Sequence, residues 1–167
     1  MWRTFPEDRV ALSEGGAVAT QASSADSLTT TEVELTEGKH YWEVELLSEN
    51  VGISIGISRP NLDPAGRYVS TECTDGWFIE ASEGALWGNG KADDDEAGSY
   101  KQGDRVGVLL DLGNGSLRFF KNGVQHGPGF PAGSVTAPVV PAVHLYTHDC
   151  AVIKTVRLLS AEEPANA

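Results

Sequence analysis

Sulfur-containing residues are scarce in this 167-residue chain, which has two cysteines and one methionine. Cys73 and Cys150 are too few for a disulfide framework, and we expect both to be buried, reduced thiols. Basic residues are also few, since 12 Lys and Arg stand against 24 Asp and Glu, for a formal net charge of −12. Because such a chain repels phosphate groups, its charge argues against nucleic acid or a membrane surface as the main partner.

Long hydrophobic runs are absent as well, since no stretch approaches the roughly 18–20 continuous apolar residues of a membrane span. The N-terminus from Met1 to Arg9 has no apolar segment of the secretory type, so we expect a cytoplasmic address. With 40 % hydrophobic and 22 % charged residues, the composition is that of a globular chain. The length predicts one domain over residues 1–160, followed by a flexible tail at residues 161–167.

Sustained helical periodicity is missing, whereas glycine (19 residues) and proline (8 residues) recur at short intervals. Between them lie short alternating runs, the clearest of which places Trp42, Val44 and Leu46 on one face of a strand at 39–46. Further strands are predicted at 51–57, 77–80, 85–87, 105–112, 116–121, 135–143 and 151–159. So many short strands in one domain predict an all-β fold, either a sandwich or a barrel.

Turn and loop signals separate these strands. We predict a type I′ hairpin turn at Asn114-Gly115, because Asn and Gly tolerate positive φ best, and a second turn at Asn122-Gly123. Stretches rich in Ser, Thr, Pro, Gly or acidic residues predict loops at 21–31, 58–68 and 91–98.

Three motifs with possible chemistry are weak. Gly52 to Gly56 matches the Gly-x-Ser-x-Gly pattern of hydrolases, but Ser54 lies inside an alternating strand and no helix follows it. His144, His148 and Cys150 lack the second half of a zinc ligand set, unless Cys73 supplies it. The acidic run Asp93 to Glu96 lacks the alternating spacing of calcium loops. We therefore expect no catalysis, metal or cofactor.

Six separate motifs nevertheless occur in the order of the SPRY (B30.2-like) domain family, which this chain resembles from about Pro6 to Leu159. They are Gly38–Glu45, Val51–Gly56, Gly76–Phe78, Gly103–Leu112, Gly115–Gly123 and Val140–Val143. The resemblance implies a bent sandwich of two antiparallel β-sheets that recognises other proteins. It also implies a peptide pocket formed by rim loops.

Position by position, the resemblance implies three pocket segments: the loop preceding the first strand, the loop around Tyr68, and a late loop at residues 144–147. The predicted peptide-binding residues are Arg9, Arg59, Arg67, Tyr68, His144, Leu145, Tyr146 and Thr147. Thr147 departs from the Trp that is frequent in the adaptor branch, so the subfamily stays open.

These observations predict a non-catalytic adaptor module, expected to be a monomer, that binds a short peptide or a partner loop. Loops on a rigid sandwich vary without disturbing the core, and Tyr and Arg are well suited to interfaces. The alternative is a lectin-like sandwich that binds carbohydrate or another small ligand. A third hypothesis, a hydrolase built on Ser54, requires that serine to be accessible.

Overall fold

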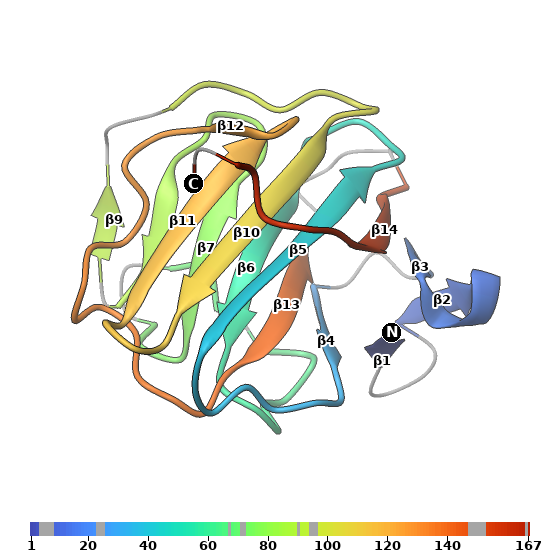
Figure 1. Cartoon of the computed structure of the whole chain (residues 1–167). Coiled ribbons are helices and arrows are strands. Elements are labelled where there is room, and N and C mark those ends of the chain that lie inside the picture. Colours follow the sequence, from blue (N-terminus) through green and yellow to red (C-terminus); the bar gives the residue numbers. More distant parts are fainter. Residues whose placement is uncertain are drawn as a thin grey trace.

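In the part of the chain that the structure describes, two antiparallel β-sheets of seven strands each form a sandwich (Figure 1). The computed structural model describes residues 1–3, 9–22, 26–66, 68–70, 73–89, 91–93, 97–146, 153–165 and 167, with backbone only at 91–93. The only helical element in these ranges is a short 3-10 turn, η1 (Glu14–Gly16). The predicted all-β, two-sheet antiparallel sandwich is therefore confirmed. No helix in the described ranges is long and apolar enough to cross a membrane.

One sheet, which we call sheet A, has the strand order β1-β4-β13-β6-β7-β8-β9. Its strands are β1 (Trp2–Arg3), β4 (Ser27–Thr31), β13 (Val140–Leu145), β6 (Ile53–Ser58), β7 (Gly76–Glu80), β8 (Leu86–Gly88) and β9 (Lys91–Asp93). β13 pairs with β4 and β6, so a late segment of the chain lies between two earlier ones.

The second sheet, sheet B, has the order β12-β11-β10-β5-β14-β3-β2. Its strands are β12 (Val124–Gln125), β11 (Ser116–Lys121), β10 (Arg105–Asp111), β5 (Lys39–Leu46), β14 (Thr155–Ser160), β3 (Val18–Gln21) and β2 (Val10–Ser13). After β14 the tail crosses β5 and β10 in Figure 1, and the Lys39 ammonium lies 3.8 Å from the Glu163 carboxylate.

The core lies between the two sheets, as the alternation predicts. Trp42, Val44 and Leu46 of β5 are buried in the same apolar cluster as the three isoleucines of β6. In β5 and β6 every second residue points to this cluster, and the residues between them face outward. Most predicted strands are confirmed, but β6, β13 and β14 start two to five residues later than expected.

The N-terminal part holds more strand than the sequence predicts. The stretch 21–31, predicted to be a loop from its Ser and Thr content, contains β4, and Ser27 and Thr29 are buried there. Thr is β-branched and suits a sheet, and pairing with β13 outweighs the polar composition. β9 likewise occupies the start of the stretch 91–98, also predicted to be a loop.

The turn prediction at Asn114-Gly115 is wrong in type. Asp111 pairs with Ser116, so the connection from β10 to β11 has four residues, and only Gly115 in it has positive φ. The two-residue turn instead lies at Asn122-Gly123, where φ is 50° and 86° and Lys121 pairs with Val124. Positive φ at both central positions defines the type I′ hairpin, and this turn creates the unpredicted strand β12.

Candidate functional site

A loop covers part of the outer face of sheet A. Residues 59–66 and 68–70, which we call the covering loop, follow β6 and lie over the strands beside it. The contacts form a second apolar cluster, separate from the core, of Leu28, Leu62, Tyr68, Val69, Phe78 and Ala142. The covering loop is therefore packed against the sheet as a fixed part of the surface.

Main-chain hydrogen bonds hold the covering loop in one conformation. The backbone N–H of Leu28 in β4 donates to the carbonyl oxygen of Pro64 at 2.9 Å. The carbonyl oxygen of Asp63 accepts from the N–H of Gly66 at 3.0 Å and from the hydroxyl of Tyr68 at 2.7 Å. Because these bonds close a tight turn on itself, the loop presents Tyr68 in a preformed position.

Three aromatic rings from two distant segments meet beside this loop. The rings of Tyr68 and His144 are 6.4 Å apart and perpendicular, and those of His144 and Tyr146 are 6.1 Å apart and tilted by 35°. His144 is only 2 % exposed, whereas Tyr68 and Tyr146 are partly exposed. We call these three residues the aromatic trio. It offers two exposed aromatic edges on a buried, hydrogen-bonded base.

The hydroxyl of Tyr68 stays protonated at neutral pH. Burial raises the pKa of the Tyr68 phenol, and the carboxylates of Asp63 and Asp75 act in the same direction. The neutral phenol donates to the Asp63 carbonyl, which fixes the ring and leaves its exposed edge available for contact.

Tyr146 is held by the turn that precedes β6. Its N–H donates to the carbonyl oxygen of Gly52 at 2.9 Å. Gly52 has a φ of +78°, and a side chain there would overlap the carbonyl oxygen of Tyr146 and come within 2.6 Å of Lys154. Only glycine fits this contact, so the sequence of the turn determines where the Tyr146 ring lies.

Arg59, a predicted binding residue, is occupied inside the protein. Its guanidinium donates to the carbonyl oxygens of Thr136 and Pro138 and stacks 5.1 Å from the centre of the Trp77 ring. These contacts tie the end of β6 to the segment before β13. Arg59 is therefore engaged by these segments, and its side chain forms no part of the aromatic trio.

The other predicted residues are spread over several places. Arg9 donates to the carbonyl oxygen of Asp26 at 2.8 Å and joins the start of β2 to the start of β4. Leu145 is 0 % exposed in the core, because β13 extends through it where a loop was expected, so its side chain touches no ligand. Arg67 and Thr147 lie outside the described residues.

Ser54 does not have the surroundings of a nucleophile. It is 0 % exposed in the middle of β6, paired with His144 on one side and Glu80 on the other. A hydrolase needs its serine at the surface of a sharp turn, so the hypothesis of a serine hydrolase loses its physical basis. The structure does not describe His148, Cys150 or the stretch 94–96. Among the residues that it does describe, no cluster of metal-ligating side chains occurs.

The base of the site contains residues that sequence reasoning missed. Phe78 of β7 lies beneath the trio, with its ring 6.5 Å from that of His144, and Asp63 and Gly66 shape the covering loop. The stretch from Asp63 to Gly66 contains Pro64, and this combination of residues is a turn signal that predicts a fixed loop.

Comparisons with known proteins agree with this architecture. The crystal structure of the SPRY domain of human HERC1 superposes with a TM-score of 0.80 at 22 % identity, covering 96 % of this chain and 99 % of that one. The TRIM65 PSpry domain gives 0.70 at 19 % identity, with coverage of 96 % and 92 %.

Two curated relatives are similar in sequence. SPRY domain-containing SOCS box protein 3 of Xenopus tropicalis is 34 % identical over 100 residues, which are 53 % of this chain and 26 % of the relative. Tripartite motif-containing protein 14 of Mus musculus is 27 % identical over 114 residues, 65 % of this chain and 26 % of that protein. The matched part thus spans about a quarter of each relative. Residues 39–157 match the family model of the SPRY domain, and the chain belongs to the SPRY domain family.

Proposed function

We propose that this protein is a non-catalytic adaptor module that binds a short peptide or a partner loop at the aromatic trio of Tyr68, His144 and Tyr146. SPRY domains are in general protein-interaction modules. The relatives named for a SOCS box and for a tripartite motif carry additional sequence outside the matched part, which supports an adaptor role. A cytoplasmic monomer without a cofactor is part of the same proposal.

The observation that carries the proposal is the fixed exposure of two tyrosines over a buried base. Tyr68 and Tyr146 come from segments far apart in sequence. The hydroxyl of Tyr68 donates to the Asp63 carbonyl, and the backbone N–H of Tyr146 donates to the Gly52 carbonyl. Tyrosine adds a large contact area with few torsions to freeze, so a preformed pair of rings binds at low entropic cost.

A random dodecapeptide library displayed on phage provides a test that needs no known partner. Phage are selected on the immobilised wild-type protein after removal of those that bind a Tyr68→Ala/Tyr146→Ala double variant. The selected peptides are then titrated by fluorescence anisotropy. We expect Tyr146→Ala to weaken binding by at least about fivefold, which corresponds to about 1 kcal/mol, with little change in Tm because the ring is partly exposed.

Two further variants serve as controls. Tyr68→Phe keeps the packing of the ring on Phe78 and removes only the hydrogen bond to Asp63, so we expect a smaller loss of affinity. Tyr41→Phe lies on the outer face of sheet B and is expected to leave binding unchanged. Selected peptides that bind the wild type, Tyr146→Ala and Tyr68→Phe with equal affinity would contradict the assignment of the binding site to the aromatic trio.

The alternative of a carbohydrate- or small-ligand-binding sandwich stays a prediction of the sequence. Binding to a glycan array that is lost on addition of a chelator would favour it over the peptide hypothesis.

A further inference from the structure

A concave surface that includes no residue of the aromatic trio lies elsewhere on the sandwich. It is a groove of about 420 Å³ at the open margin between the two sheets, where β5 begins and β14 ends. Its volume falls within the range of roughly 300–1,000 Å³ that is usual for ligand sites. None of the residues lining it belongs to the aromatic trio or to the covering loop.

The walls of the groove are apolar and come from both sheets. Trp42 and Leu158 belong to sheet B, Pro141 to sheet A, and Leu35 to the connection between β4 and β5. Trp42 and Pro141 are buried, and Leu35 and Leu158 pack against the core. The lining also includes the polar side chains of Lys39, His40 and Ser160, and the apolar part of the groove has the character to accept one aliphatic or aromatic side chain.

The rim of the groove, in contrast, is acidic. Glu37 lies two residues before the lining residue Lys39, and its carbonyl oxygen is 2.7 Å from the ring of His40, another lining residue. Glu162 lies two residues after the lining residue Ser160. Both glutamates are exposed, and neither forms an ion pair with a basic side chain among the described residues. The one basic side chain with an ion pair at the rim, Lys39, pairs with Glu163 of the tail.

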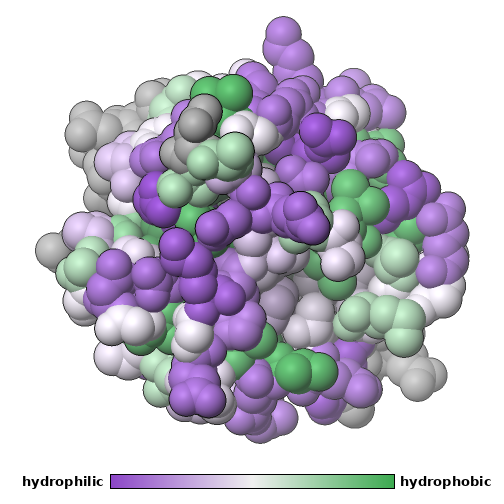
Figure 2. Space-filling model, in the orientation of Figure 1, coloured by the Kyte–Doolittle hydropathy of each residue, from purple (hydrophilic) through white to green (hydrophobic). Residues whose placement is uncertain are grey.

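Hydrophilic residues cover most of the face seen in Figure 2, and hydrophobic surface occurs there in small separate areas. A partner therefore cannot be held on this face by a broad apolar interface, and a single inserted side chain with charged flanks is the contact that the surface allows.

From this juxtaposition we propose that the groove docks an extended basic segment of a partner protein, with one apolar side chain inserted between the sheets and flanking Lys or Arg residues against Glu37 and Glu162. The apolar walls supply the affinity for the inserted side chain. The unpaired carboxylates attract the basic flanks and set the orientation of the segment. This site is additional to the aromatic trio, and either can exist without the other.

The probe for this proposal is a fluorescein-labelled heptapeptide of sequence KRKFKRK, titrated with the full chain and followed by anisotropy. Two companion peptides separate its two features, KRKGKRK lacking the apolar side chain and EDEFEDE reversing the flanking charge. We expect KRKFKRK to bind at least about tenfold more tightly than either companion, and its affinity to fall as the salt concentration rises.

Protein variants then place the binding in the groove. Ser160→Trp puts a large side chain at the exposed mouth and is expected to weaken KRKFKRK binding at least about tenfold. Glu37→Gln/Glu162→Gln is expected to weaken it about fivefold and to reduce its salt dependence. The matched double variant Glu49→Gln/Glu83→Gln removes two exposed charges elsewhere, and we expect less than about a twofold effect.

Each result decides for or against the groove. No binding of KRKFKRK up to about 1 mM, or equal binding of KRKGKRK, overturns the proposal. Unchanged affinity in both Ser160→Trp and Glu37→Gln/Glu162→Gln also overturns it. Tyr146→Ala is included so that the two sites stay distinguishable, because it should weaken the phage-selected peptides and leave KRKFKRK binding as it is.

Discussion

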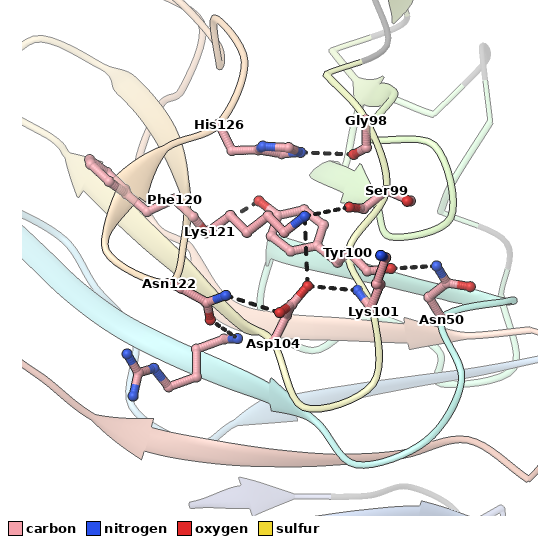
Figure 3. A network of polar contacts seen from close by, with 11 residues as sticks. Asn50, Gly98, Ser99, Tyr100, Lys101, Asp104, Phe120, Lys121, Asn122 and His126 are labelled. Carbon is pink, nitrogen blue, oxygen red and sulfur yellow. Dashed lines mark hydrogen bonds and ion pairs between the residues drawn. The ribbon is translucent and has the colours of Figure 1, made fainter.

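Two segments that leave sheet A are fixed to the sandwich through different kinds of side chain. The covering loop after β6 is held by main-chain hydrogen bonds and by an apolar cluster. The segment 97–104, which precedes β10 and which we call the crossover segment, also has main-chain hydrogen bonds, to Ala81, Glu83 and Leu46. In addition, polar side chains of the β11–β12 hairpin bind it (Figure 3). The comparison shows which of the two keeps side chains available to a partner.

A polar network surrounds the crossover segment. Lys121 donates to the carbonyl oxygen of Ser99 at 2.9 Å, and the imidazole of His126 contacts the carbonyl oxygen of Gly98 at 2.7 Å. Asn122 donates to the Asp104 carboxylate at 2.9 Å (Figure 3). Groups engaged in this way are unavailable to a partner. The covering loop is packed through apolar side chains and keeps Tyr68 partly exposed, so it is the better carrier of a recognition surface.

The largest expected effect concerns the platform beneath the covering loop. Gly56 lies in the middle of β6, and a side chain there would overlap the carbonyl oxygen of Trp77 in the neighbouring strand. Because two paired backbones would have to separate, we expect Gly56→Ala to cost about 3 kcal/mol or more in the free energy of unfolding. Urea denaturation measures it.

The matched control for this prediction lies in the network region. Gly123 has a φ of +86° and open space around its Cβ position. Gly123→Ala therefore costs only the left-handed conformation, about 1–2 kcal/mol. Equal costs for the two variants would show that sheet A is no more sensitive to packing than the hairpin in sheet B.

The sequence predicted the regular strands of both sheets and missed what depends on long-range pairing. Strand β5 was predicted with its bounds, because its alternation is strict over eight residues. Strand β1 has two residues and exists only through its pairing with β4, so no local pattern reveals it. Asn114-Gly115 shows the same limit, since the register of β10 and β11 decides which turn forms.

The second prediction tests whether the network holds the crossover segment. The side chain of Asn122 donates to Asp104 and accepts the N–H of Arg105 at 2.9 Å, and its own φ is +50°. We expect Asn122→Ala to cost about 2 kcal/mol and Asn122→Gly about 1 kcal/mol, because glycine removes only the hydrogen bonds and not the preferred turn conformation. Hydrogen exchange at Lys101 should rise in both. Unchanged exchange there would mean that the network does not fix this segment.

The third prediction compares a buried tryptophan of sheet A with one of sheet B. Trp77 of β7 is 2 % exposed and its indole N–H donates to the carbonyl oxygen of Ser134 at 3.0 Å. Trp42 of β5 is 7 % exposed, and its indole N–H is buried without an acceptor among the described residues. Both lose the same ring volume in Trp→Phe variants. We therefore expect Trp77→Phe to cost about 1 kcal/mol more than Trp42→Phe by urea denaturation, and the reverse order would contradict this account.

The site residues show a similar division between what was and was not predictable. Tyr68, His144 and Tyr146 were all named from the family resemblance, and the structure brings them together. Arginine is common at protein interfaces, which is why Arg59 was predicted to bind a partner. Only its contacts with Thr136 and Trp77 show that its guanidinium is engaged within the protein. Residue type and loop position are visible in a sequence, whereas the engagement of a side chain by a distant segment is not.

The smallest expected effect is the acid sensitivity of the network. Although burial acts to raise it, hydrogen bonds from Asn122 and Lys101 and the charges of Lys121 and Lys101 together hold the pKa of Asp104 below its ordinary value of 3.8. A depressed carboxyl pKa stabilises the folded state above the ordinary value, and this contribution is lost as pH falls through the lower folded pKa. Because the Asp104 carboxylate is partly exposed to solvent, which screens its interactions, the effect is at most about 1 kcal/mol. We expect the difference in unfolding free energy between wild type and Asp104→Asn to be constant from pH 7 to about 5 and to shrink below about pH 4.

The control is Glu49→Gln, whose carboxylate is exposed and outside the network. The difference in unfolding free energy between wild type and this variant should not shrink in this way. A constant difference for Asp104→Asn down to about pH 3 would remove the carboxylate from the groups that hold the crossover segment.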